Sequence, residues 1–406
     1  IILYTISEYI LLGNHSIYEW LTILELPTID NTINNEVLSN DFYTISTINS
    51  PKIYFAKFVY LITLGFFEHT SLLFFLKLII IFFKPLLLFL ILINFTEKNK
   101  YYLFNNSAFT KSISALFAIG YLSFIHPDIA TGWSSFVDYD FINSLNFSIF
   151  LGLVAIYLFQ KYTLKNFIGI IILCIATFIH PVAGWINFIM ILLLFNNFKK
   201  FKDIFLLFTY NKLLILLIVI IIPCIYLILN FPDTEKVSEG ILNNIAVTYR
   251  HPYHLIISSF FSLITVAWIS LPLLAFLYSS YTNNNKGQIY SILIFLITVG
   301  LFFIQYFFTE VYFYSVISLQ IQPNRIMIHS SFMYIILLFI CVNNKSINVD
   351  VLKKSMLAPF KLFIILSFTF FAVTGFIIKK EPLQWDLESR KILNYIKEQS
   401  VNNKED

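Results

Sequence analysis

The most regular feature of the chain is a succession of long apolar segments separated by short polar ones. These segments run for roughly 17 to 25 residues, the length that an α-helix needs to cross the hydrocarbon core of a bilayer. In lipid the backbone N–H and C=O groups must bond within the segment, so each segment is predicted to be a helix. The apolar residues are continuous and do not alternate with polar ones, which excludes a porin-like barrel.

The segments predicted to be complete spans are Ser71–Asn94, Ala108–Ile125, Ile142–Phe159, Leu164–Ile179, Val182–Phe195, Leu213–Leu229, His254–Ser279, Ile289–Phe308, Ile326–Val342 and Leu357–Ile378. Ile1–Leu12 is too short to span and is interpreted as the end of a first helix. The predicted fold is therefore all-α, a polytopic transmembrane helical bundle with about eleven spans. Because Val182–Phe195 is short, either its ends are wrong or the Pro181 region enters the membrane as irregular backbone buried in protein.

The segment Pro51–Phe67 is left outside this count. It is apolar and aromatic but interrupted by Lys52 and Lys57, a pattern typical of a helix lying in the membrane interface. It belongs to a large first loop, residues 13–70, whose polar part carries several acidic residues and no Lys or Arg before Lys52. We expect this loop and its interfacial helix to lie on the outer face.

The distribution of lysine predicts the orientation of the bundle. Alternate loops carry Lys98, Lys100, Lys161, Lys165, Lys199, Lys200, Lys202, Lys286, Lys345, Lys353 and Lys354. By the positive-inside rule these loops face the cytoplasm. The loops between them are predicted to lie outside. They are the acidic first loop, the His126 loop, the His180 turn, residues 231–253 and residues 309–325. A true span at Pro51–Phe67 would put the Lys98 loop outside, so the charge pattern independently favours an interfacial helix.

Composition narrows the class of protein. Hydrophobic residues make up 58% and charged residues 12% of the 406 residues, about half the charge usual in a soluble domain. The net charge of +4 comes mostly from Lys, and heavy use of Ile, Asn, Lys and Phe suggests an AT-rich bacterial genome. We therefore expect a multi-pass protein of the bacterial cytoplasmic membrane, in contact with membrane lipids and with no nucleic-acid partner. The three cysteines lie in apolar segments and are interpreted as buried free thiols.

Two regions are predicted along the chain. Residues 1–380 form the transmembrane domain. Residues 381–406 carry apolar positions at helical spacing with charges between them, which predicts an amphipathic tail on the outer face. The alternative for this tail is the start of a truncated extramembrane domain.

Unusual polar residues gather on the predicted outer side, and two of them are histidines that precede proline. His126 and His180 each stand where a helix is expected to stop, because the residue before proline is disfavoured in a helix. Each imidazole is a candidate proton carrier or hydrogen-bond partner for a phosphate or sugar. The alternative is an interfacial histidine, with Trp133 and Trp185 as ordinary aromatic anchors.

Carboxylates in the outer loops are candidates for acid–base chemistry. Asp30 and Asp41 lie in the first loop, and Asp128 follows His126 and Pro127. A carboxylate there could act as general base toward an acceptor hydroxyl or bind a divalent cation. The alternative is a solvated acid of a translocated loop.

Cations on the outer side are candidates for binding a phosphate. The chain contains three Arg, and two of them, Arg250 and Arg325, fall in predicted outer loops. Arginine offers a planar fork that binds phosphate through two hydrogen bonds, which lysine cannot reproduce. Arg250 opens the sequence RHPYH, which ends at His254. The alternative for both is an anchor that snorkels to the interface.

Lys84 lies inside a predicted span, directly before Pro85. A central lysine costs on the order of 2.5 to 3.5 kcal/mol on insertion scales, so it is expected to face the bundle interior or a wet cavity. Lys77 in the same span is interpreted as snorkelling outward.

This layout resembles the polyprenyl-phosphate-sugar-dependent glycosyltransferases of the GT-C type, or a relative with the same arrangement. The likeness is one of order: a first helix, a large acidic outer loop, a lateral helix led by Ser50-Pro51-Lys52-Ile53-Tyr54, then many spans with outer-face His and Arg. It implies a polyprenyl-phosphate-sugar lipid as partner, a catalytic acid at Asp41 or Asp30, and a phosphate-binding arginine at Arg325.

The expected function is therefore transfer of a sugar from a lipid phosphate on the outer face. One alternative is a secondary transporter or flippase, in which the same His, Asp and Arg form a relay. A second is a polysaccharide polymerase or ligase, but the largest outer loop is the first one here, which favours the transferase. Candidate catalytic residues are Asp41, Asp30, His126 and Asp128, and candidate substrate-binding residues are Arg325, Arg250, His180, His254 and Lys84.

Overall fold

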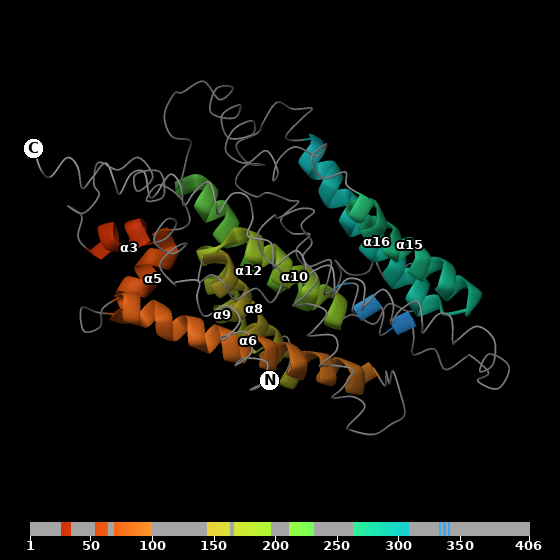
Figure 1. Cartoon of the computed structure of the whole chain (residues 1–406), viewed down its shortest axis with the longest axis horizontal. Helices are drawn as coiled ribbons and strands as arrows, with labels where there is room; N and C mark the ends of the chain where they lie inside the picture. The colour runs from red at the N-terminus through yellow and green to blue at the C-terminus, as the bar shows by residue number, and fades with distance from the viewer. Residues whose placement is uncertain are drawn as a thin grey trace, which may run out of the picture. The chain divides into compact units, whose positions relative to one another are not determined.

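A computed structural model of the chain divides it into two compact units, Ile1–Asn348 and Val349–Asp406. The residues that the structure describes all belong to the first unit. They are residues 26–33, 53–63, 69–99, 144–162, 166–195, 211–230 and 263–307, with residues 333, 336, 337, 340 and 341. This part of the chain is α-helical and contains no strand (Figure 1).

The helices match most of the apolar segments. They are α3 (Leu26–Ile33), α5 (Ile53–Thr63), α6 (His69–Asn99), α8 (Ser144–Lys161), α9 (Phe167–Ile179), α10 (Pro181–Phe195), α12 (Asn211–Asn230), α15 (Leu263–Tyr281) and α16 (Asn285–Tyr306). The predicted helical character is confirmed for the apolar segments that coincide with α6, α8, α9, α10, α12, α15 and α16. Ala108–Ile125 and Leu357–Ile378 lie outside the described residues.

Helix α3 was not predicted from the sequence. It lies in the polar first loop, but Leu26, Ile29 and Ile33 recur at helical spacing. Ile29 is fully buried, as is Thr28. The apolar stripe is short and stands among Asn and Asp residues, so the pattern of the loop as a whole obscured it.

Helices α8, α9 and α10 form a tightly packed group. The Ser148 hydroxyl of α8 donates to the Ala176 carbonyl of α9, and the Phe159 ring lies against Gly169. Ascending positions on α8 therefore meet descending positions on α9, so these two helices are antiparallel. Helix α10 turns back after α9 and runs in the direction of α8, with Asn187 beside Gly152.

Helix α6 accompanies α8 in the same direction. Leu76 and Ile80 share a buried cluster with Phe147 near the start of α8. Near the other end, the Asn94 amide donates to the Gln160 side chain at 3.4 Å, and Gln160 donates to the Ile91 carbonyl at 3.2 Å. The two contacts fix the α6–α8 pair at both ends.

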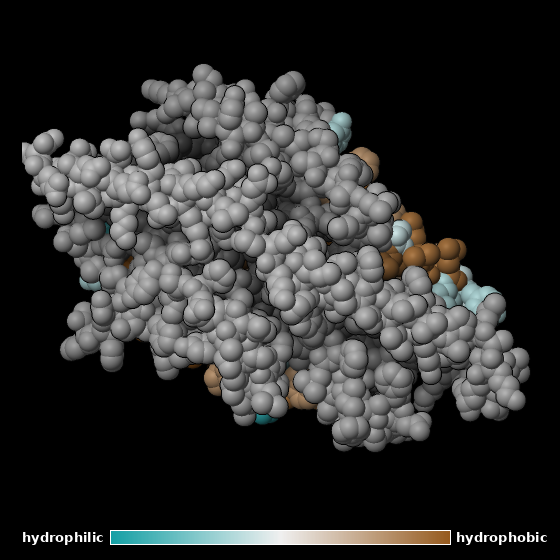
Figure 2. Space-filling model, viewed as in Figure 1, coloured by the Kyte–Doolittle hydropathy of each residue, from teal (hydrophilic) through white to brown (hydrophobic). Residues whose placement is uncertain are grey.

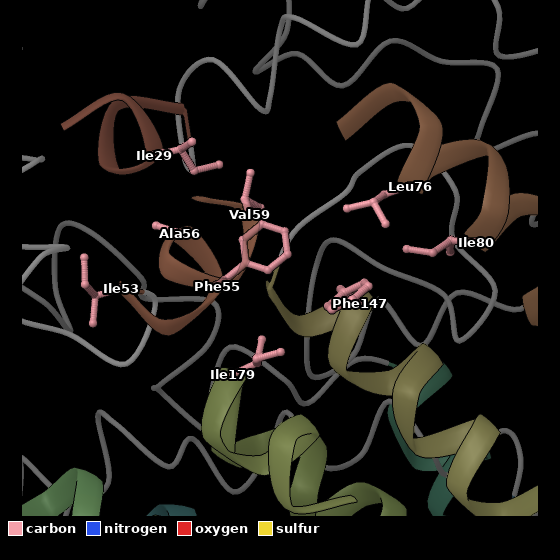
Figure 3. Close-up of a cluster of buried hydrophobic side chains, with 9 residues drawn as sticks. All are labelled: Ile29, Ile53, Phe55, Ala56, Val59, Leu76, Ile80, Phe147 and Ile179. Carbon is pink, nitrogen blue, oxygen red and sulfur yellow. The ribbon is translucent and has the colours of Figure 1, made fainter. Parts of the chain in front are cut away.

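A buried apolar cluster joins α3 and α5 to one end of this group (Figure 3). Its members are Ile29, Ile53, Phe55, Ala56, Val59, Leu76, Ile80, Phe147 and Ile179. Leu76 and Ile80 come from the first half of α6 and Phe147 from the start of α8, and Ile179 is the last residue of α9. Helix α5 is 11 residues long, about 16 Å, which is too short to cross a bilayer and fits the predicted interfacial helix.

Helices α15 and α16 form an antiparallel hairpin (Figure 1). Asn283 in the turn has a φ of 53°, in the left-handed region that asparagine tolerates. Asn284 caps α16 by accepting a hydrogen bond from the Gly287 N–H at 3.0 Å, and its amide donates to the Ile340 carbonyl at 3.1 Å. Tyr290 donates to the Leu193 carbonyl at 3.2 Å, so the turn end of the hairpin meets the C-terminal turn of α10.

Two of the described helices are long and apolar enough to cross a membrane, α8 and the Asn285–Ile304 part of α16. Helices α9 and α10 have 13 and 15 residues, about 20 and 22 Å, so neither alone matches a core of about 30 Å. Large apolar side chains are nevertheless exposed on several helices, and Figure 2 shows hydrophobic surface over the α15–α16 hairpin. The structure is thus that of a helical protein with two candidate spans.

Candidate functional site

His180 forms the junction between α9 and α10. Its backbone is extended, with φ of −151° and ψ of 105°, as expected for a residue before proline. Its N–H donates to the Ala176 carbonyl at 3.0 Å, and its carbonyl accepts from the Ala183 N–H at 3.0 Å. His180 therefore ends one helix and caps the next. The prediction that the helix stops at His180 is confirmed.

Pro181 explains why the second helix begins immediately. Proline suits the first position of a helix because its missing N–H would have no partner there and its φ is already helical. The turn is therefore a single residue long, and it holds the half-buried His180 imidazole at the tip of the α9–α10 pair. The alternative of irregular backbone in the Pro181 region is wrong, because Pro181 is the first residue of α10.

A layer of polar side chains lies within one to two helical turns of His180. Thr177 donates back to the Leu173 carbonyl at 2.8 Å, and its side chain would lie 2.6 Å from a Cβ added at Gly184. Ser148 bonds the Ala176 carbonyl. All these side chains are fully buried, so the three helices meet through small polar residues at this level.

Asn187 is the unusual member of this layer. It is fully buried, and within the structure neither its Nδ2 nor its Oδ1 has a hydrogen-bond partner. Burial of an amide without hydrogen-bond partners costs on the order of 1 to 3 kcal/mol of folding free energy, as judged from mutations in proteins. The side chain faces Gly152 of α8, where the absence of a Cβ leaves room for it.

Lys84 is fully buried at the middle of α6. Successive helical turns place it on the same side of α6 as Ile80 and Ile91, and these two residues lie at the contacts with α8. The expectation that Lys84 faces the protein interior is confirmed. Its part in substrate binding stays a prediction.

An aromatic group joins α5, α9 and α12 beside the His180 turn. The rings of Tyr54, Phe178 and Tyr226 have centroid separations of 6.0, 6.5 and 5.6 Å. The Lys57 ammonium lies 5.8 Å from the centre of the Tyr54 ring. Burial, with a smaller contribution from Tyr226, raises the pKa of Tyr54 to about 12, so this phenol remains protonated at neutral pH.

Asp30 lies within α3, which packs against α5. Its helix therefore stands at the same end of the α6–α8–α9 group as the His180 turn, since Ile29 and Ile179 share one cluster (Figure 3). The remaining predicted site residues lie outside the described residues: Asp41, His126, Asp128, Arg250, His254 and Arg325.

Sequence reasoning missed Asn187, Tyr54 and Tyr226. Asn187 is a polar residue in an otherwise apolar stretch, PVAGWINFIMILLLF, and this interruption was the available signal. The tyrosines carried no signal, because aromatic residues are common throughout the chain and only tertiary packing distinguishes these two. Within the described part of the chain, no group of three or more His, Cys, Asp or Glu could hold a metal ion.

Comparisons with known proteins provide no identity for this site, since no family model, curated protein or solved structure matches the chain.

Proposed function

We propose that the chain is a multi-pass protein of the bacterial cytoplasmic membrane, with about eleven spans. The contacts between the described helices lie at two opposite ends of the helix bundle, which supports the proposal. Asn94 with Gln160, Tyr290 with Leu193, and Asn284 with Ile340 all join residues close to lysine-bearing segments. The positive-inside rule assigns such segments to the cytoplasm. Helices α3 and α5 and the His180 turn gather at the opposite ends.

Exposed apolar stripes also support a lipid environment. On α12 the exposed apolar side chains include Ile215, Ile218, Ile222, Ile225 and Leu229, and Tyr226 is exposed beside them. Further exposed apolar residues occur on α9, α15 and α16. A soluble monomer rarely exposes contiguous apolar surface on this scale, whereas lipid tails solvate it at no cost.

The function that this arrangement supports best is transfer of a sugar from a lipid phosphate on the outer face. The observation that carries the proposal is the packing of α3 and α5, both from the acidic first loop, on the helix ends next to His180. A lateral helix there would lie beside the headgroups of the membrane. A donor held by its lipid tail would thus present its phosphate and sugar to the loop that contains Asp30 and Asp41.

In the proposed reaction, an acceptor hydroxyl attacks the anomeric carbon of the donor sugar. Asp41 or Asp30 takes the hydroxyl proton as general base. The bond between the anomeric carbon and the phosphate oxygen breaks, and the lipid phosphate leaves with the electron pair. Arg325 and Arg250 stabilise its charge. His126 and Asp128 assist the proton transfer, and His180 and His254 supply hydrogen bonds to the sugar and phosphate. The carboxylates are also candidate ligands of a divalent cation.

The test is a transferase assay with polyprenyl-phosphate sugars on the purified, reconstituted chain. Asp41→Asn should remove turnover and leave donor binding nearly intact, because the amide keeps the shape and loses the base. Arg325→Lys should weaken donor binding, because it keeps the charge and loses the fork. Asp203→Asn, in a predicted cytoplasmic loop, is the matched control. Wild-type activity in both outer-face variants would refute the proposal.

A second candidate function is transport, and one observation favours it. Lys84 is fully buried at mid-helix on the side of α6 that faces α8, and the buried amide of Asn187 lies against Gly152 of α8. Ionisable residues deep in a bundle are typical of substrate or ion pathways. Loss of solute uptake in Lys84→Gln proteoliposomes, with transferase activity absent from the wild type, would establish this alternative.

A further inference from the structure

The aromatic group of Tyr54, Phe178 and Tyr226 combines packing with hydrogen-bond donors. Its rings come from α5, α9 and α12, so it joins three elements at the end of the bundle where α5 lies. Two of the three rings carry hydroxyls, and Tyr226 contributes to the raised pKa of Tyr54 as a hydrogen-bond partner. Phe178 shows that a ring without a hydroxyl also packs here. Packing of the three rings alone therefore does not require the two hydroxyls.

The same group presents a cation at its surface. Lys57 is exposed on α5, and its ammonium lies 5.8 Å from the Tyr54 ring centre. Tyr226 is 44% exposed, and Tyr54 is half-buried. An anion that approaches this surface would thus meet an ammonium and phenol hydroxyls within one small area.

The chemistry of these groups selects a class of ligand. Lysine binds phosphate as a point charge, and phenol hydroxyls donate hydrogen bonds to its oxygens. The exposed neighbours of Lys57 on α5 are Tyr60, Leu61 and Ile62. A mixed face of one cation and apolar side chains is typical of a helix at the lipid headgroup level. The favoured ligand is therefore a phosphate close to a hydrocarbon chain.

We propose that Lys57, Tyr54 and Tyr226 form a phosphate-binding patch that holds the headgroup of a polyprenyl phosphate at the junction of α5, α9 and α12. This inference rests on the proposed transferase function and adds a positioning site to it. The patch would hold the phosphate of the donor beside the His180 turn, because Phe178 belongs to the last turn of α9 and precedes His180 by two residues.

The test is a binding assay on the full chain in nanodiscs of zwitterionic phosphatidylcholine. The probe is a radiolabelled long-chain polyprenyl monophosphate, and the competitors are the matched neutral polyprenol and inorganic phosphate. Lys57→Gln and Tyr226→Phe should each weaken binding about tenfold, the effect of losing one hydrogen bond to a charged group. Tyr54→Phe should give a smaller loss, because the Tyr54 hydroxyl is already hydrogen-bonded with Tyr226.

Lys161 and Tyr162 provide matched controls. The Lys161 ammonium also lies 5.8 Å from a tyrosine ring, that of Tyr162, at the end of α8 farthest from α5. Lys161→Gln and Tyr162→Phe should bind the probe like the wild type. Equal losses in these controls, or equal competition by the neutral polyprenol, would overturn the patch.

The competitors and a parallel turnover assay separate the remaining outcomes. If inorganic phosphate competes with the probe in the wild type and fails to do so in the Lys57 and Tyr226 variants, this result would support the patch and show that it also binds free phosphate. Wild-type binding in all patch variants, with sugar transfer intact, would refute the patch and leave the proposed function standing. Patch-dependent binding without any sugar transfer would refute only the proposed function.

Discussion

The carboxamide of Asn187 on α10 occupies the space beside Gly152 on α8 that a Cβ would fill. The Cγ, Oδ1 and Nδ2 atoms of Asn187 would all collide with that Cβ, and both residues are buried. Gly152→Ala is therefore expected to destabilise the protein by about 1 to 3 kcal/mol, the usual cost of overpacking. A lower midpoint of thermal unfolding in detergent would report the effect.

Two variants control this prediction. Gly300 on α16 has no atom within 4 Å of an added Cβ, so Gly300→Ala should be neutral or stabilising by about 0.5 to 1 kcal/mol. Asn187→Ala should relieve the clash. The loss of stability in the Gly152→Ala/Asn187→Ala double variant should therefore be smaller than the sum of the losses in the two single variants. Strict additivity would show that the two side chains do not meet.

Replacement of Asn187 by Leu tests whether its buried amide lacks hydrogen-bond partners. Within the structure neither terminal atom of this side chain is hydrogen-bonded, so the amide contributes a desolvation cost and no bond. Leu has a similar shape without polar atoms, and Asn187→Leu should raise stability by about 1 to 2 kcal/mol. Ser148→Ala, which removes a hydroxyl bonded to Ala176, should lower it by about 1 kcal/mol. A destabilised Asn187→Leu protein would show that the amide has a partner.

The sequence predicted the helices well where a long apolar stretch set the pattern, as in α6, which continues through Pro85. It also predicted the interior position of Lys84, because a charge in lipid is costly. It failed where neighbours in space decide the outcome. The short stripe of α3 is stabilised by burial against α5, and the pairing of Asn187 with Gly152 depends on the register of α8 with α10. Periodicity within one segment contains no information on such register.

Asn284 should respond differently to two substitutions. Its Oδ1 caps α16 through the Gly287 N–H, and its Nδ2 donates to the Ile340 carbonyl. Asn284→Asp keeps the cap acceptor and loses the donor, whereas Asn284→Ala loses both. We expect the alanine variant to be about 1 kcal/mol less stable than the aspartate variant, which is the usual value of an N-cap. Equal midpoints of thermal unfolding would contradict the cap.

Tyr290 offers a test of the contact between α16 and α10. It is fully buried and donates to the Leu193 carbonyl at 3.2 Å. Tyr290→Phe keeps the ring and leaves a buried carbonyl short of one donor, so it should cost about 1 kcal/mol. Tyr162→Phe, at a position that is 58% exposed, is the control and should be neutral. Equal stability of both variants would place Tyr290 outside this contact.

The two-ended arrangement of the bundle makes a specific prediction for accessibility. With Cys174, Cys224 and Cys341 replaced, single cysteines in 134–138 should react with an impermeant maleimide from outside intact cells, and those in 199–202 should not.

The structure extends this pattern to residues it describes. Lys57 on α5 belongs to the end that holds the His180 turn, whereas Lys161 follows Gln160, which contacts Asn94 at the other end. Lys57→Cys should therefore react like 134–138, and Lys161→Cys like 199–202. The fully reversed pattern would invert the orientation and refute the outer-face site, while reaction of both lysine positions from one side would refute the two-ended arrangement itself.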